Sequence, residues 1–150
     1  MNNEDLKMEI TEEIHVKAPL QVTFDALVAQ LRAGITGEAD KLMPMKLEAW
    51  PGGIWARDLS AELGEGNGHF WAHVQAIKRP TLLEFCGPLI MSYAATSNMQ
   101  YRLSEEPGGT LIKFRHSAFG VIQGDHRAGI GQGWAKTNAL TKARAEAATA

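Results

Sequence analysis

A histidine and a tyrosine on neighbouring predicted strands could act as an acid and base pair. His116 follows Ile112 and Phe114 at alternate positions of one strand, so these three side chains should point to the same face. Tyr101 alternates in the same way with Met99. A histidine exchanges a proton near neutral pH, so the pair would suit a cyclase, hydratase or lyase. The alternatives are a histidine hydrogen-bonded to backbone near the sheet edge and a tyrosine packed in the core.

One arginine and two tryptophans suit a binding pocket. Arg57 shares its alternation with Trp55, and an inward guanidinium would bind a carboxylate through two hydrogen bonds. An outward, solvated arginine is the alternative. Trp55 and Trp134 could form the floor of a pocket. Trp50 and Trp71 could equally lie on the outer face or in a dimer contact, because one β-bulge reverses the alternation beyond it.

The histidines and the cysteine do not predict a metal centre. His69 and His73 have the four-residue spacing of a helical zinc site. On a strand they would lie about 13 Å apart, which is too far to share an ion. Cys86 is the only cysteine and has no evident activating base, so we interpret it as a buried structural thiol. We expect no metal and no cofactor.

Two glycine-rich segments lack the surroundings of a nucleotide site. Residues 64–68 alternate glycine with acidic and amide residues, which favours a flexible hairpin between two strands. Residues 129–133 resemble the start of a dinucleotide-binding motif, but no parallel strand–helix–strand unit surrounds them. A nucleotide is therefore not an expected ligand.

Length and charge narrow the remaining classes. The chain has 150 residues, which suits one domain, and its 15 Lys and Arg against 17 Asp and Glu give a net charge of -2. There is no broad positive field for nucleic acid. The N-terminus lacks a cationic start and apolar core, so we expect a cytoplasmic protein. No apolar run approaches the roughly 20 residues that span a bilayer.

The hydrophobic pattern predicts a helix, a sheet and a second helix. After a strand at residues 8–16, Pro19 suits the first turn of an amphipathic helix that stops near Gly34. Residues 34–44 form a mobile connector with at most a helical turn at 39–43. A proline-free final segment, 125–150, favours a helix, with flexible residues 1–6 and a frayed end at 143–150. The further strands are expected at 45–50, 54–61, 69–78, 82–86, 97–104 and 111–117.

Several short motifs in this order resemble a known superfamily. They are the segment 14–19 entering a helix, the turn 51–53, the spacing Val74, Ile77, Pro80, and the turn 107–110 before residues 114–117. Together with Gly133–Trp134, they are similar to the START-like, or SRPBCC, superfamily. Within it, the chain most resembles bacterial single-domain homologues of the activator of the ninety-kilodalton heat-shock chaperone ATPase, over residues 14–134.

The resemblance implies an α+β helix-grip fold. In it, a curved antiparallel sheet of about seven strands wraps around a long C-terminal helix, with a helix after the first strand. Related proteins hold lipids, hormones or polyketides in the enclosed cavity, and the resemblance also implies a role like that of stress-response proteins. Two departures stand out: the paired tryptophans usual after the first helix are absent, and Thr137 and Asn138 replace bulky aliphatics after Gly-Trp. Smaller and polar side chains would widen the cavity or make it more polar.

These observations favour a binding protein for an apolar or amphipathic small molecule. The alternatives are a cyclase or lyase that uses His116 and Tyr101, and a protein-interaction module related to chaperone ATPase activators. The last could be a homodimer that uses the surface around Trp50, Trp71 or residues 91–93. The expected ligand-binding residues are Trp55, Arg57, Met99, Tyr101, Phe114, His116, Trp134 and Asn138.

Overall fold

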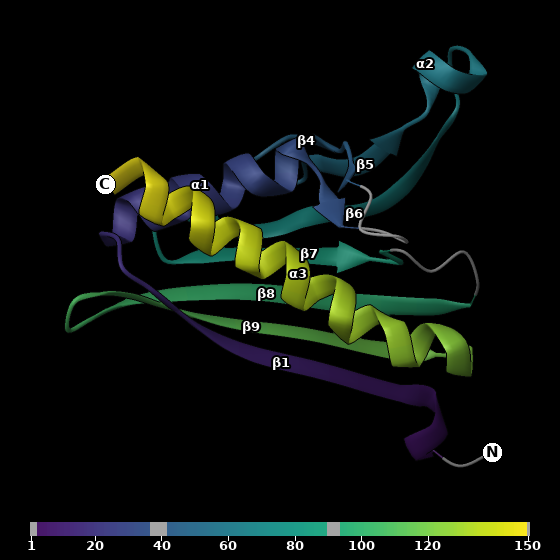
Figure 1. The fold of residues 1–150 in the computed structure, drawn as a ribbon. Coiled ribbons are helices and arrows are strands. Elements are labelled where there is room, and N and C mark those ends of the chain that lie inside the picture. The colour runs from purple at the N-terminus through teal and green to yellow at the C-terminus, as the bar shows by residue number, and fades with distance from the viewer. Residues whose placement is uncertain (1–2, 37–41, 90–93, 150) are drawn as a thin grey trace.

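A seven-stranded antiparallel sheet and a long C-terminal helix make up most of the chain (Figure 1). The structure is a computed structural model, and it describes residues 3–36, 42–89 and 94–149. The sheet order is β1-β9-β8-β7-β6-β5-β4. Its strands are β1 (Lys7–Val16), β4 (Lys46–Leu47), β5 (Ile54–Asp58), β6 (Gly68–Lys78), β7 (Leu82–Gly87), β8 (Ala95–Glu106) and β9 (Gly109–Gly120).

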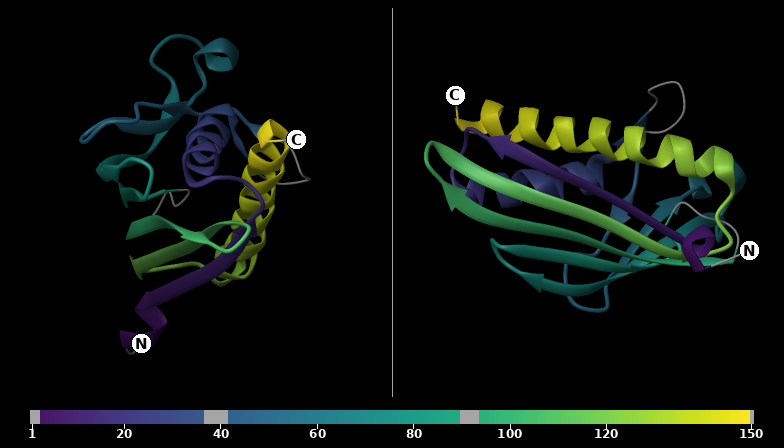
Figure 2. Two further views of the ribbon diagram at one scale, coloured as in Figure 1. Left: turned by 90° about the vertical axis from the view of Figure 1, so that its left-hand side faces the viewer. Right: turned by 90° about the horizontal axis from the view of Figure 1, so that it is seen from below.

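Two helices cover the concave face of the sheet. α1 (Leu20–Ala33) follows β1 and packs against α3 (Gly124–Thr149), which runs along the sheet (Figure 2). The α+β helix-grip architecture predicted from the sequence is therefore confirmed. No helix within the described ranges is long and apolar enough to cross a membrane.

The alternation of side chains explains why one face of β8 and β9 is buried. In β9, Ile112, Phe114 and His116 are at most 2% exposed, whereas Lys113 and Arg115 between them face solvent. β8 pairs with β9 in register, with Tyr101 opposite Phe114. Because strand side chains alternate between faces, the apolar set of both strands lies under α3.

A β-bulge in β6 breaks this alternation. Trp55 pairs with Ala72 and the next residue of β5 pairs with Phe70, so Trp71 is an extra residue on β6. Both Trp71 and Ala72 are consequently buried, while His73 is exposed. This bulge places Trp71 in the core, and not on the outer face or in a dimer contact, the two positions considered from the sequence.

Two predicted strands are shorter than expected. The strand expected at 45–50 is only two residues long, β4, and a turn closed by the hydrogen bond from Gly53 N–H to the Trp50 carbonyl follows it. The strand expected at 54–61 ends at Asp58, whose carboxylate accepts a hydrogen bond from the Ser60 N–H at 2.8 Å. That contact begins a short helix, α2 (Ser60–Leu63). β5 and β6 still pair as an antiparallel hairpin, as expected, and its connection contains α2 as well as residues 64–67.

The connector after α1 contains two short strands. β2 (Ile35–Thr36) pairs with β3 (Leu42–Met43) as a separate two-stranded sheet. The helical turn expected at 39–43 falls mostly on residues 37–41, which lie outside the described residues, and its last two residues are in β3.

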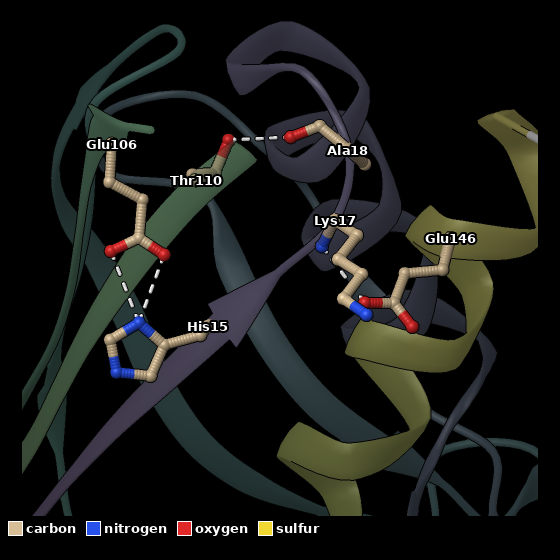
Figure 3. Close-up of polar contacts among 6 residues, drawn as sticks. All are labelled: His15, Lys17, Ala18, Glu106, Thr110 and Glu146. Carbon is tan, nitrogen blue, oxygen red and sulfur yellow. Dashed lines mark hydrogen bonds and ion pairs between the residues drawn. The ribbon is translucent and has the colours of Figure 1, made fainter. Parts of the chain in front are cut away.

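Three polar contacts join the end of β1 to distant parts of the chain (Figure 3). The Thr110 hydroxyl donates to the Ala18 carbonyl at 2.8 Å, and the Lys17 N–H donates to the Glu146 carboxylate at 2.8 Å. His15 Nδ1 donates to the carboxylate of Glu106 at 2.9 Å. The first two contacts attach the start of α1 to β9 and to the C-terminal part of α3.

Replacing Gly109 by alanine should destabilise the fold, because the new Cβ would overlap the Val16 carbonyl in the β1–β9 pairing. Two backbones meet there, so relief needs movement of a strand, and we expect a loss of about 2 kcal/mol or more in the free energy of unfolding. Urea denaturation measures it. Gly124→Ala is the matched control, because no heavy atom lies within 4 Å of its added Cβ. Equal stability of the two variants would contradict the close approach.

Candidate functional site

Five aromatic residues from five elements form the interior between the sheet and α3, here called the aromatic layer. None is more than 3% exposed. Trp55 stacks on Phe85 with ring centroids 4.6 Å apart and meets Trp134 at 6.4 Å. Trp134 in turn lies 5.9 Å from the ring of Phe114. The members of the layer are Trp55 of β5, Trp71 of β6, Phe85 of β7, Phe114 of β9 and Trp134 of α3.

His116 is fully buried beside this layer and uses both ring nitrogens. The indole N–H of Trp134 donates to its Nδ1 at 2.9 Å, and its Nε2 lies 2.9 Å from the Ser97 hydroxyl. Because an indole nitrogen can only donate, Nδ1 must carry the lone pair. His116 is therefore the neutral tautomer with its proton on Nε2, which donates to Ser97.

Burial keeps this histidine neutral. Loss of solvation lowers the pKa of His116 from 6.5 to about 4. A proton can reach Nδ1 only if the hydrogen bond from Trp134 is broken. His116 therefore acts here as an acceptor that holds α3, and it has no free lone pair for use as a base.

Tyr101 belongs to a second polar chain that runs from the interior to the edge of β1. Its hydroxyl donates to Asn138 Oδ1 at 2.8 Å, and Asn138 Nδ2 donates to Glu12 Oε1 at 2.8 Å. Burial, and to a smaller extent the charge of Glu12, raise the pKa of Tyr101 well above its usual value. The hydroxyl is therefore a hydrogen-bond donor at any pH at which the protein would work.

The two candidate catalytic residues face the same interior but serve different partners. They lie on adjacent strands, where His116 is opposite Met99 and Tyr101 is opposite Phe114. Within the described ranges, every buried side-chain nitrogen and oxygen has a hydrogen-bond partner. Acid and base catalysis by this pair would require both sets of contacts to open.

Most of the expected ligand-binding residues lie together in the interior. All of them except Arg57 are at most 3% exposed, namely Trp55, Met99, Tyr101, Phe114, His116, Trp134 and Asn138. Arg57 is half-buried near the end of β5, beside the exposed Asp58. Whether any of these residues binds a ligand stays a prediction.

Sequence reasoning missed three participants in this interior. Ser97 shares its alternation with Met99 and could have been found from that pattern. Glu12 was not recognisable, because its partner Asn138 lies 126 residues further along the chain. Phe85 was assigned to a strand without a role in the site.

His69 and His73 make contacts apart from this interior network. His69 Nδ1 accepts from the indole of Trp71 at 3.2 Å, and His73 Nδ1 donates to the Gly52 carbonyl at 3.1 Å. Over the part of the chain that the structure describes, no three His, Cys, Asp or Glu side chains come close enough to hold a metal ion.

Solved structures of other proteins support the fold, whereas the other two comparisons found nothing. No protein-family model matches the chain. No curated protein matches it either. Among solved structures, the di-domain ARO/CYC StfQ from the steffimycin biosynthetic pathway is similar with a TM-score of 0.70 and 13% identity, over 98% of this chain and 53% of that one.

Two further structures, each covered over most of its length, give the same result. An uncharacterized protein from Rhizobium leguminosarum has a TM-score of 0.63 and 20% identity, over 93% of this chain and 92% of its own. Ara h 8.0201 has a TM-score of 0.64 and 15% identity, over 93% of this chain and 95% of its own. At these identities the likeness establishes the helix-grip fold alone.

The buried state of His116 should make the protein less stable in mild acid. Its pKa is lower in the folded protein than in the unfolded chain, so unfolding takes up a proton between pH 6.5 and about 4. The contribution of His116 to the free energy of unfolding should be fully present above pH 6.5. It should be lost as the pH falls towards 4, and the loss should reach about 3 kcal/mol. Urea denaturation at stepped pH measures the slope. In His116→Gln, which keeps the other four histidines, the slope should be shallower, and an unchanged slope would contradict the assignment.

The Tyr101–Asn138 contact should show a coupling energy. Tyr101→Phe leaves the Asn138 oxygen buried without a donor, which should cost about 1–3 kcal/mol of stability. Once Asn138→Leu is present, the same tyrosine change should cost much less, because the oxygen has gone. A double-mutant cycle by chemical denaturation measures the difference, and strict additivity would show that the hydrogen bond contributes nothing.

Proposed function

We propose that this protein binds an apolar or amphipathic small molecule between the concave face of the sheet and α3. The observation that carries the proposal is the aromatic layer, which joins large apolar surfaces to two polar pairs, His116–Ser97 and Tyr101–Asn138. Mostly apolar walls with a few oriented polar groups are typical of small-molecule sites.

The buried face of α3 supports this location. Its large apolar side chains are Ile130 and Trp134, both in the N-terminal half. Further along, the buried positions are Thr137, Asn138, Thr141 and Ala145. These small and polar side chains fill less of the space over the sheet than aliphatic residues would, so a ligand could complete the packing.

The hydrogen bonds of the interior indicate the kind of ligand. Because the polar groups already satisfy one another, a ligand gains most by replacing ring contacts around Trp55 and Trp134. A planar apolar molecule meets this requirement. StfQ is described as an ARO/CYC of a biosynthetic pathway, which agrees with such a ligand in a related fold.

The other hypotheses receive less support. The enzyme alternative requires His116 to release Trp134, and the chaperone-activator relationship and the cytoplasmic location stay predictions. For the homodimer, Trp71 is buried and three of its expected surface residues, 91–93, lie outside the described residues. Among the described residues of that surface, Trp50, 57% exposed, stays a candidate for the contact.

Ligand binding should change the emission of the buried tryptophans. In a Trp50→Phe background, the remaining signal comes from Trp55, Trp71 and Trp134, which are all at most 3% exposed. Titration with a panel of fatty acids and planar polyketides should give a saturable change, and native mass spectrometry should show one added molecule. If neither signal appears with any member of the panel, the proposal is wrong.

A substitution that adds volume to the interior separates interior binding from surface adsorption. Thr137→Leu adds volume on the buried face of α3 and should weaken binding by about tenfold or more. Ala135→Leu adds a leucine to the exposed face of the same helix and is the matched control. Equal affinities for the two variants would place the ligand outside the interior.

A further inference from the structure

The outer face of β1, β9 and β8 carries a compact group of polar side chains around a depression of about 440 Å³. The register arranges six of them in two rows. Thr11, Arg115 and Gln100 are opposite one another in one row, and Glu13, Lys113 and Arg102 in the next. All six line the depression, which we call the outer pocket.

Glu12 and Phe114 complete the lining of the outer pocket, so its charged side chains are three cations and two carboxylates, and the cations are in excess by one. Arg102 and Lys113 are directly cross-strand, and like charges in this position destabilise a sheet. Among the described residues, the three cations of the outer pocket form no ion pair with a carboxylate. Such a cluster stands out on a chain with a net charge of -2.

One glutamine holds both arginines in place. The Gln100 Oε1 atom accepts from Arg102 Nε at 3.3 Å and from Arg115 Nη2 at 3.4 Å. The Gln100 amide nitrogen donates to the Glu84 carboxylate on β7, which fixes the orientation of the glutamine. Each guanidinium has five N–H donors, so both arginines keep several for another acceptor.

From this arrangement we propose that the outer pocket binds a small molecule through an oxyanion group, a phosphate ester or a carboxylate. Two positioned guanidinium groups match the paired oxygens of either group, and Lys113 adds a third positive charge. The Thr11 hydroxyl, opposite Arg115, can donate a further hydrogen bond. The pocket volume lies in the range of small-molecule sites.

The cations of this site lie on the opposite face of the sheet from the proposed interior site, and Glu12 and Phe114 border both sites. Arg115 and Lys113 alternate with His116 and Phe114 along β9, so the two sites lie on opposite faces of the same strand. The outer pocket would therefore bind its ligand in Thr137→Leu, whether or not the interior binds an apolar molecule.

The test is an NMR titration of 15N-labelled protein with inorganic phosphate and, separately, with succinate, at constant ionic strength. We expect saturable shifts confined to residues 11–13, 100–102 and 113–115. Saturation by phosphate alone identifies a phosphate ligand, and saturation by succinate alone identifies a carboxylate. If neither anion saturates the shifts by about 50 mM, a range that already represents very weak binding, the proposal is overturned.

Variants that remove a positive or a negative charge from the pocket distinguish a binding site from a general effect of net charge. Lys113→Gln should weaken binding by about fivefold or more, and Glu13→Gln should strengthen it about twofold, since each changes one charge in the pocket. Lys78→Gln and Glu65→Gln make the same changes at exposed positions elsewhere and should have no effect. If the controls change the affinity as much as their counterparts, the anion responds only to net charge and the proposal fails.

Discussion

The hydrogen bond from the Trp134 indole to His116 fixes how α3 lies on the sheet. A buried indole N–H needs an acceptor, and the neutral imidazole supplies it because Ser97 takes the proton on the other nitrogen. The bond sets the rotation of the helix and its distance from β9. Near the C-terminal end of α3, the Lys17 N–H donates to the Glu146 carboxylate and Arg144 Nε donates to Gln30 Oε1. The helix is therefore attached at both ends of its buried face.

This attachment decides what the interior can do. His116 holds the helix through the same lone pair that a base would need, and Tyr101 donates its proton to Asn138. The groups that suggested acid–base chemistry therefore organise an apolar wall. The alternation along β9 gives the strand two different faces, with Phe114 and His116 toward the helix and Lys113 and Arg115 toward solvent.

Much of this arrangement followed from the sequence, because alternation and helical spacing are local. Met99, Tyr101, Phe114 and His116 were assigned to one buried face from parity alone, and the structure places them there. The same argument failed to assign Trp71, since a bulge depends on the pairing between β5 and β6 and leaves no local pattern. Arg57 shares β5 with Trp55 but is only half-buried, and the register of the β5–β6 pairing shifts between Trp55 and Ala56.

The partners of the polar residues could not be predicted for a related reason. His116 was recognised as a candidate acid or base, but its role depends on an indole 18 residues away that arrives from the opposite layer. Glu12 likewise gains its role only once α3 crosses β1. Residue types and spacing identify which groups are inside, whereas packing between layers decides which of them remain free to react.

The most direct test of the account is a crystal structure of the protein saturated with the ligand that changes its tryptophan emission most. The account predicts ligand density between α3 and the sheet, in contact with Trp55 and Trp134, with the indole of Trp134 still bonded to His116. Density on the outer surface only, or an interior with the same ring contacts as the unliganded protein, would contradict it.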